Sequence, residues 1–179
     1  MNKTINDPLL TVARIGTILA QIGLAIGQVM LGLVVTVTVI AALGLIPADV
    51  VAPEYAAIPG KVLAVAALGM LLIILALASM FDFFRRLREI IDSVAEGDPF
   101  VAQNAARLTR MAWLALAAQA AMLVAASLSV WVGTQVDREV FEIKIDVSLT
   151  GILVAIILFI LARVFLKGAE MREDLEGTV

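Results

Sequence analysis

Uncharged apolar runs alternate with charged segments along the whole chain. Residues 62–81 form a run of twenty uncharged positions, and residues 111–136 form one of twenty-six. About twenty apolar residues, at 1.5 Å each, cross a hydrocarbon core of roughly 30 Å. Two further runs cover the thirty-four residues 15–48 and the sixteen residues 147–162. The pattern therefore predicts an all-α integral membrane protein with four transmembrane helices.

The predicted spans and their connections use the whole length of the chain. We expect the spans at about residues 23–45, 62–81, 111–133 and 148–166. The fourth run is the shortest, and Arg163 extends it if the side chain reaches the interface. A helical hairpin at residues 82–110 joins the second span to the third. Residues 1–179 are thus interpreted as a single four-helix membrane domain.

The first apolar run is too long for a cleavable signal peptide. The apolar region of a signal peptide has about 7–15 residues, whereas this run has thirty-four. Asp7 is a suitable N-cap and Pro8 a suitable first helical residue. We expect a helix that begins at the membrane surface and then crosses the bilayer.

Lysine and arginine are distributed unevenly between the two predicted faces. Ten of them lie in the termini and in the hairpin 82–110, and only three lie in the other two loops. Loops rich in these residues stay in the cytoplasm. We therefore expect both termini and the hairpin to be cytoplasmic.

Composition argues against several classes of function. The chain is 62% apolar, against about 45–50% in soluble proteins. It contains neither cysteine nor histidine, so it lacks thiolate ligands and the commonest metal ligand and general base. Asp82, Asp92 and Asp98 have helical pairing and capping roles, so we expect no enzyme, cofactor or metal. The arginines are mixed with acids, which argues against direct nucleic-acid binding.

The hairpin segment has an apolar stripe at helical spacing. The stripe comprises Leu87, Ile90, Ile91 and Val94. Opposite charges at i, i+4 support the same helix, in the pairs Arg85–Glu89 and Arg88–Asp92. Three interpretations remain open. The stripe packs within the hairpin, or one apolar edge binds a helix of a cytoplasmic partner. The third is that the arginines of the segment hold anionic lipid headgroups at about 1 kcal/mol each, although the nearby acids argue against it.

A turn is predicted at the tip of the hairpin. Gly97 is a typical helix stop, Asp98 a typical N-cap, and Pro99 a typical first residue of the next helix. Phe100 follows directly and is the exposed aromatic residue that we expect a partner to contact.

No charged residue lies in the middle of a predicted span, which argues against a proton-coupled transporter. Gln21, Gln28 and Gln119 are the larger polar residues near or within the spans. Such side chains usually form hydrogen bonds between helices, although they also line substrate paths. Gly23 and Gly27 permit close helix approach.

Residues 141–147 alternate apolar and charged side chains with a period of two. This alternation is typical of a half-buried strand. The segment either forms a short extracytoplasmic strand paired with the first outer loop (residues 47–61), or lies on the bilayer rim, or pairs across a dimer. We expect it to cap the bundle or to sense a ligand.

Two segments resemble a known family. Residues 97–108, Gly-Asp-Pro-Phe-Val-Ala-Gln-Asn-Ala-Ala-Arg-Leu, are similar to the turn before the third span in the bacterial membrane proteins called domain of unknown function 2975. Residues 165–174 are similar to the ending of that family, although Gly177 stands where an apolar residue is expected. The resemblance implies the bacterial cytoplasmic (inner) membrane. It also implies genes placed beside a small helix-turn-helix regulator.

Together these features predict a non-enzymatic regulatory or sensor-adaptor module. The expected partners are the lipid bilayer, a cytoplasmic helix-turn-helix regulator and a second copy of the chain. The candidate partner-binding residues are Gly97, Asp98, Pro99, Phe100, Asn104 and Arg107. The alternative is a small oligomeric transporter or channel.

Overall fold

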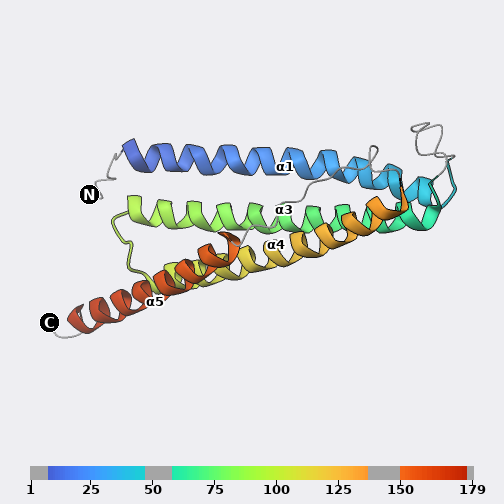
Figure 1. Cartoon of the computed structure of the whole chain (residues 1–179). Helices are drawn as coiled ribbons and strands as arrows, with labels where there is room; N and C mark the ends of the chain where they lie inside the picture. The colour runs from blue at the N-terminus through green and yellow to red at the C-terminus, as the bar shows by residue number, and fades with distance from the viewer. Residues whose placement is uncertain (1–7, 47–57, 137–149, 177–179) are drawn as a thin grey trace. The chain divides into compact units, whose positions relative to one another are not determined.

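The computed structural model describes residues 8–46, 58–136 and 150–176, and these contain four α-helices (Figure 1). The helices are α1 (Pro8–Ala42), α3 (Gly60–Ala95), α4 (Ala102–Gln135) and α5 (Thr150–Glu176). Each is long and apolar enough to cross a membrane. The predicted four-helix class is therefore confirmed, and each predicted span overlaps one helix. The predicted strand at residues 141–147 and the predicted N-cap Asp7 lie outside the described residues.

Local sequence explains where α1 begins and ends. Pro8 is its first residue, as predicted, and a proline fits there because the first N–H of a helix has no intrahelical acceptor. Gly44 follows the helix with a φ of 69°. The N–H of Leu45 donates to the carbonyl of Ile40 at 3.1 Å. A left-handed glycine with this hydrogen bond is a common way to satisfy the last carbonyls of a helix.

Contacts group the chain into two compact units. The first contains the described residues 8–25, 79–117 and 150–176, and the second contains residues 26–46, 58–78 and 118–136. The structure does not test whether the whole chain is one domain, which stays a prediction.

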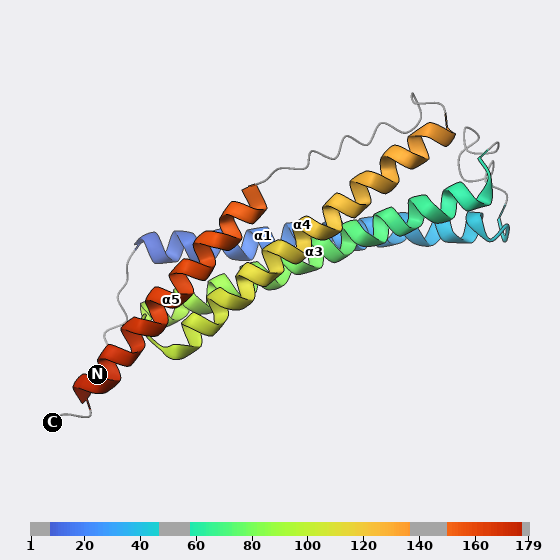
Figure 2. The same ribbon diagram turned by 60° about the horizontal axis from the view of Figure 1, so that its bottom comes forward.

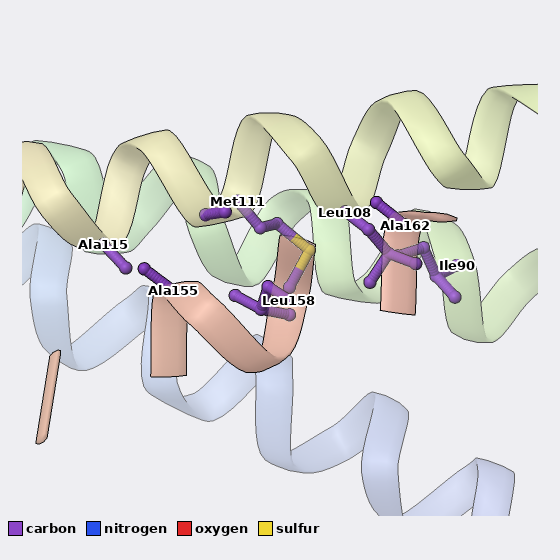
Figure 3. Close-up of a cluster of buried hydrophobic side chains, with 8 residues drawn as sticks. Ile90, Leu108, Met111, Ala115, Ala155, Leu158 and Ala162 are labelled. Atoms are coloured by element: carbon purple, nitrogen blue, oxygen red, sulfur yellow. The ribbon is translucent and has the colours of Figure 1, made fainter. Parts of the chain in front are cut away.

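The core of the first unit joins α3, α4 and α5 (Figure 3). Met111 of α4 is its largest fully buried side chain and extends toward Leu158 of α5. Ala115 and Ala155 face each other along the same contact. Small residues let helix backbones approach closely, which is the main source of packing between helices in lipid. In both views α5 lies along the first half of α4 (Figure 2).

The second unit has a smaller core, centred on Val62, Ala66 and Val132. A close approach occurs beside it, where α3 begins next to the end of α1. A Cβ atom at Gly60 would lie 2.8 Å from the carbonyl oxygen of Ala42. Only glycine fits there, because the opposing atom belongs to the backbone and cannot rotate away.

We expect Gly60→Ala to lower the free energy of unfolding by about 2 kcal/mol, since the new methyl group forces α1 and α3 apart. The measurement is unfolding of the purified protein in mild detergent, followed by circular dichroism. Gly133→Ala is the matched control, because a Cβ there meets nothing within 4 Å. That control should be neutral or more stable, since alanine favours a helix over glycine by up to about 1 kcal/mol. A Gly60→Ala protein as stable as wild type would contradict the predicted clash.

Candidate interaction site at the α3–α4 turn

Gly97 ends α3 in the way the sequence predicts. Its φ is 87°, in the left-handed region that glycine adopts without steric cost. Its N–H donates to the carbonyl of Val94 at 3.0 Å, and the N–H of Asp98 donates to the carbonyl of Ser93 at 3.1 Å. These two hydrogen bonds form a Schellman motif. The sharp reversal directs the chain back toward α4.

The predicted start of the next helix is wrong. Asp98 is not the N-cap and Pro99 is not the first helical residue, because α4 begins at Ala102. The backbone N–H of Asn104 donates to the carbonyl of Val101 at 2.9 Å, which sets the first helical turn later. The carbonyl of Pro99 instead accepts a hydrogen bond from the side chain of Asn104. A side chain that bonds the backbone locally competes with the helical pattern.

Asn104 is the centre of the turn. Its side chain is fully buried, with a relative exposure of 0%. The amide nitrogen Nδ2 donates to Ser93 Oγ at 2.7 Å and to the carbonyl of Pro99 at 2.9 Å. The amide oxygen Oδ1 accepts from Arg107 Nη1 at 2.7 Å. One side chain therefore links the last turn of α3, the connecting segment and the first turns of α4.

Arg107 continues this network to α3. Its Nε donates to Glu89 Oε2 at 3.0 Å, and its Nη1 donates to the Glu89 carbonyl at 3.5 Å. The two residues are 18 positions apart, so their pairing fixes one helix against the other. Arg85 and Arg86 lie 3.5 and 3.8 Å from the same carboxylate. Charge-assisted hydrogen bonds of this kind are stronger than neutral ones.

The last part of α5 packs against the same turn. The ring of Phe100 lies 5.3 Å from the ring of Phe165, centre to centre. A Cβ atom at Gly168 would lie 2.7 Å from Phe100 Cδ1, so the ring covers this glycine directly. Asp98 pairs with Arg172 one turn further along α5. The two segments that carry the family resemblance are therefore in contact with each other.

Polar contacts also join α1 to α3. Arg14 Nε lies 3.4 Å from Asp92 Oδ1, and Arg88 Nη1 donates to Gln21 Oε1 at 3.3 Å. The predicted Arg88–Asp92 pair is therefore wrong, because both residues bind groups on α1. The predicted Arg85–Glu89 pair is confirmed at 3.5 Å. Gln21 makes the interhelical contact expected of it.

The apolar stripe of the hairpin is turned into the core. Ile90 is buried, and Leu87 and Val94 pack against the cluster that contains Leu108 and Met111. The interpretation that this stripe packs internally is therefore confirmed for these residues. The apolar surface that remains exposed at the turn is not part of this stripe.

The candidate residues thus divide into two groups. Asn104 and Arg107 form the hydrogen bonds that join α3 to α4. Gly97 shapes the turn between these helices, and Asp98 binds α5. Phe100 is the apolar residue among them that combines a contact with α5 and an exposed surface, with 44% of its area open. The described part of the chain contains no group of three or more His, Cys, Asp or Glu residues able to hold a metal. Paired side chains such as Asn104 and Arg107 are suited to holding helices in a fixed arrangement.

Sequence reasoning missed the residues of α5 that complete this arrangement. Phe165, Gly168 and Arg172 contact the turn, and they belong to the ending that carried the family resemblance. The one signal in the sequence was that this ending and residues 97–108 both carry the family resemblance. Neither hydropathy nor helical spacing reveals it.

The fold and site define an α-helical membrane protein whose charged turn is held by its own last helix. The chain belongs to the family described as "Protein of unknown function (DUF2975)", whose model matches residues 45–179. The match confirms the resemblance and includes both the turn and α5. Comparison with curated proteins and with solved structures finds no match.

Proposed function

We propose that the protein is a non-enzymatic regulatory or sensor-adaptor module that binds a helix of a cytoplasmic partner. The observation that supports this is an apolar surface beside the α3–α4 turn, which we call the tip surface. It consists of Phe100, Met171 and Leu175, which are 44%, 54% and 72% exposed. An amphipathic helix that binds an apolar surface uses anchors of this kind.

Helical spacing places the tip surface on one side of α5. Gly168, Met171 and Leu175 follow one another at i, i+3 and i+7, so they share a face. Phe100 rests on Gly168 and extends that face to the turn. The surface is therefore built from two segments that are distant in sequence. A partner that contacts this surface therefore binds only while α5 is packed against the turn.

The position of the tip surface supports a partner in water rather than in lipid. Lys167, Glu170 and Arg172 lie on the same part of α5, and charged residues at this density are too costly for the hydrocarbon core. The excess of lysine and arginine at this end favours the cytoplasmic side of a bacterial inner membrane. A cytoplasmic helix-turn-helix regulator, which the family resemblance implies, is the partner we propose.

Substitution of Met171 by glutamate tests the proposal without disturbing the core. We expect this variant to weaken partner binding by a factor of about thirty, which corresponds to loss of an anchor worth about 2 kcal/mol. The measurement is affinity purification from native membranes in mild detergent, with each co-purifying protein quantified against wild type. Phe100→Glu should lose the same protein, because it removes a second anchor.

Gln103→Glu is the matched control. Gln103 is exposed in the first turn of α4 and lines the side of the turn formed by Glu89 and Asp98. The substitution adds the same charge near the turn but leaves the tip surface intact. The proposal is supported only if a DNA-binding regulator co-purifies with wild type and with Gln103→Glu but does not co-purify with Met171→Glu. Equal recovery from all variants would refute it.

The alternative predicted from the sequence, a small oligomeric transporter or channel, stays a hypothesis. Flux measurements on the protein reconstituted in liposomes would test it.

A further inference from the structure

An apolar groove of about 650 Å³ lies between α4 and α5. Small residues of α4 form one wall, and larger residues of α5 form the other. The first wall includes Ala102, Ala106 and Thr109, and the second includes Ile160, Arg163 and Leu166. Alanines opposite long side chains leave a channel that a narrow apolar group fits.

Two arginines beside the groove have no partner among the described residues. Arg163 lines the groove, and Arg110 follows Ala106 by one helical turn on the same exposed face of α4. No hydrogen bond or ion pair joins either one to a side chain of the described part of the chain. The other described arginines of this unit do have such partners. The charge near the groove is therefore uncompensated.

The position of these arginines matches a headgroup region. Arg110 immediately precedes the uncharged run of α4, and Arg163 immediately follows that of α5. The exposed Trp113 lies one turn deeper, with its ring 5.5 Å from that of Phe159. Tryptophan favours the level where lipid headgroups meet acyl chains. The apolar part of the groove at Phe159 and Ile160 then lies on the hydrocarbon side of Arg163.

We propose that this groove binds an anionic phospholipid. The phosphate pairs with the guanidinium groups of Arg163 and Arg110, the headgroup lies against the alanines of α4, and one acyl chain follows Ile160 and Phe159 into the hydrocarbon. Basic pockets between membrane helices bind anionic headgroups by this chemistry. Charge complementarity selects the occupant, because an apolar chain with an acidic head satisfies both the groove and the unpaired arginines. The inference does not depend on the proposed adaptor role.

Native mass spectrometry of the purified full chain tests the site. The protein is titrated with phosphatidylglycerol and, separately, with phosphatidylcholine of identical acyl chains. We expect wild type to retain one phosphatidylglycerol preferentially, and Arg110→Gln with Arg163→Gln to lose about thirtyfold in that preference. Lys3→Gln with Lys61→Gln removes the same charge elsewhere in the sequence, so its preference should change less than twofold.

A second pair of variants tests the part of the groove that α4 lines. Ala106→Phe fills the groove and should weaken retention of both lipids, whereas Ala117→Phe, on an exposed position of α4 outside it, should not. Soluble glycerol phosphate at equal concentration should not displace the lipid. Equal retention of the two lipids by wild type would overturn the proposal. So would an unchanged preference in the arginine variant, displacement by glycerol phosphate, or a protein found bound over the groove.

Discussion

Replacing Asn104 with alanine is expected to lower the free energy of unfolding by about 3 kcal/mol. The side chain is fully buried and makes three hydrogen bonds, to Ser93, Pro99 and Arg107. Its removal leaves the Pro99 carbonyl without that donor and takes an acceptor from a charged guanidinium. Buried groups left unsatisfied cost about 1–3 kcal/mol each, more when charged. The measurement is unfolding in mixed detergent micelles, followed by circular dichroism.

Gln103→Ala provides the control for that experiment. It removes a neighbouring amide that is exposed, and surface substitutions of this kind usually change stability by less than about 0.5 kcal/mol. A similarly small effect of Asn104→Ala would show that the turn does not depend on the buried amide. Asn104→Ala should also weaken partner binding at the tip surface, because Phe100 lies only four residues from Asn104 and is held by the same turn.

The helices were predictable because the bilayer makes length and charge nearly sufficient signals. An uncharged run such as residues 62–81 must satisfy its backbone groups internally when it lies in hydrocarbon, and a helix does so. Hydropathy does not mark where a helix ends. The predicted fourth span stops at residue 166, whereas α5 continues to Glu176. Its charged last turns leave the hydrocarbon but keep helical geometry, supported by pairs such as Lys167–Glu170 at 3.0 Å.

The local part of the turn was also predictable, but its partners were not. Glycine adopts a positive φ without steric cost, so Gly97 by itself predicts the end of α3. Glu89 illustrates the limit. Spacing correctly pairs it with Arg85 at i, i+4, yet its shortest contact is Arg107, 18 positions away. Only the packing of two helices brings those groups together, and no periodicity within one helix encodes it.

The prediction of where α4 begins was wrong for a related reason. Asp98 followed by Pro99 is a common opening for a helix, and the local signal favoured it. The Asn104 side chain binds the Pro99 carbonyl from five residues away, and Arg172 of α5 pairs with Asp98. Together these contacts outweigh a capping preference of about 1 kcal/mol. The residues that resemble the family motif thus shape the turn and hold it against α5.

The docking of α5 can be broken at one position. Ala155 is 1% exposed and faces α4 at Ala115. We expect Ala155→Phe to lower the free energy of unfolding by about 3 kcal/mol, because a ring cannot fit where two backbones approach and overpacking costs up to about that amount. The same change should separate Phe165 from Phe100 at the turn. A cysteine pair at exposed positions of α4 and α5, read by spin-label distances, would measure that separation alongside the unfolding experiment.

Ile156→Phe isolates the steric effect from the change in composition. Ile156 is the next residue along the helix but is 51% exposed, so a ring there meets lipid and should leave stability within about 0.5 kcal/mol of wild type. If α5 is held by this contact, Ala155→Phe alone separates α5 from the turn and weakens partner binding at the tip surface. If both variants keep wild-type stability and distances, the α4–α5 contact does not hold the last helix. The tip surface would then have no support from the core beneath it.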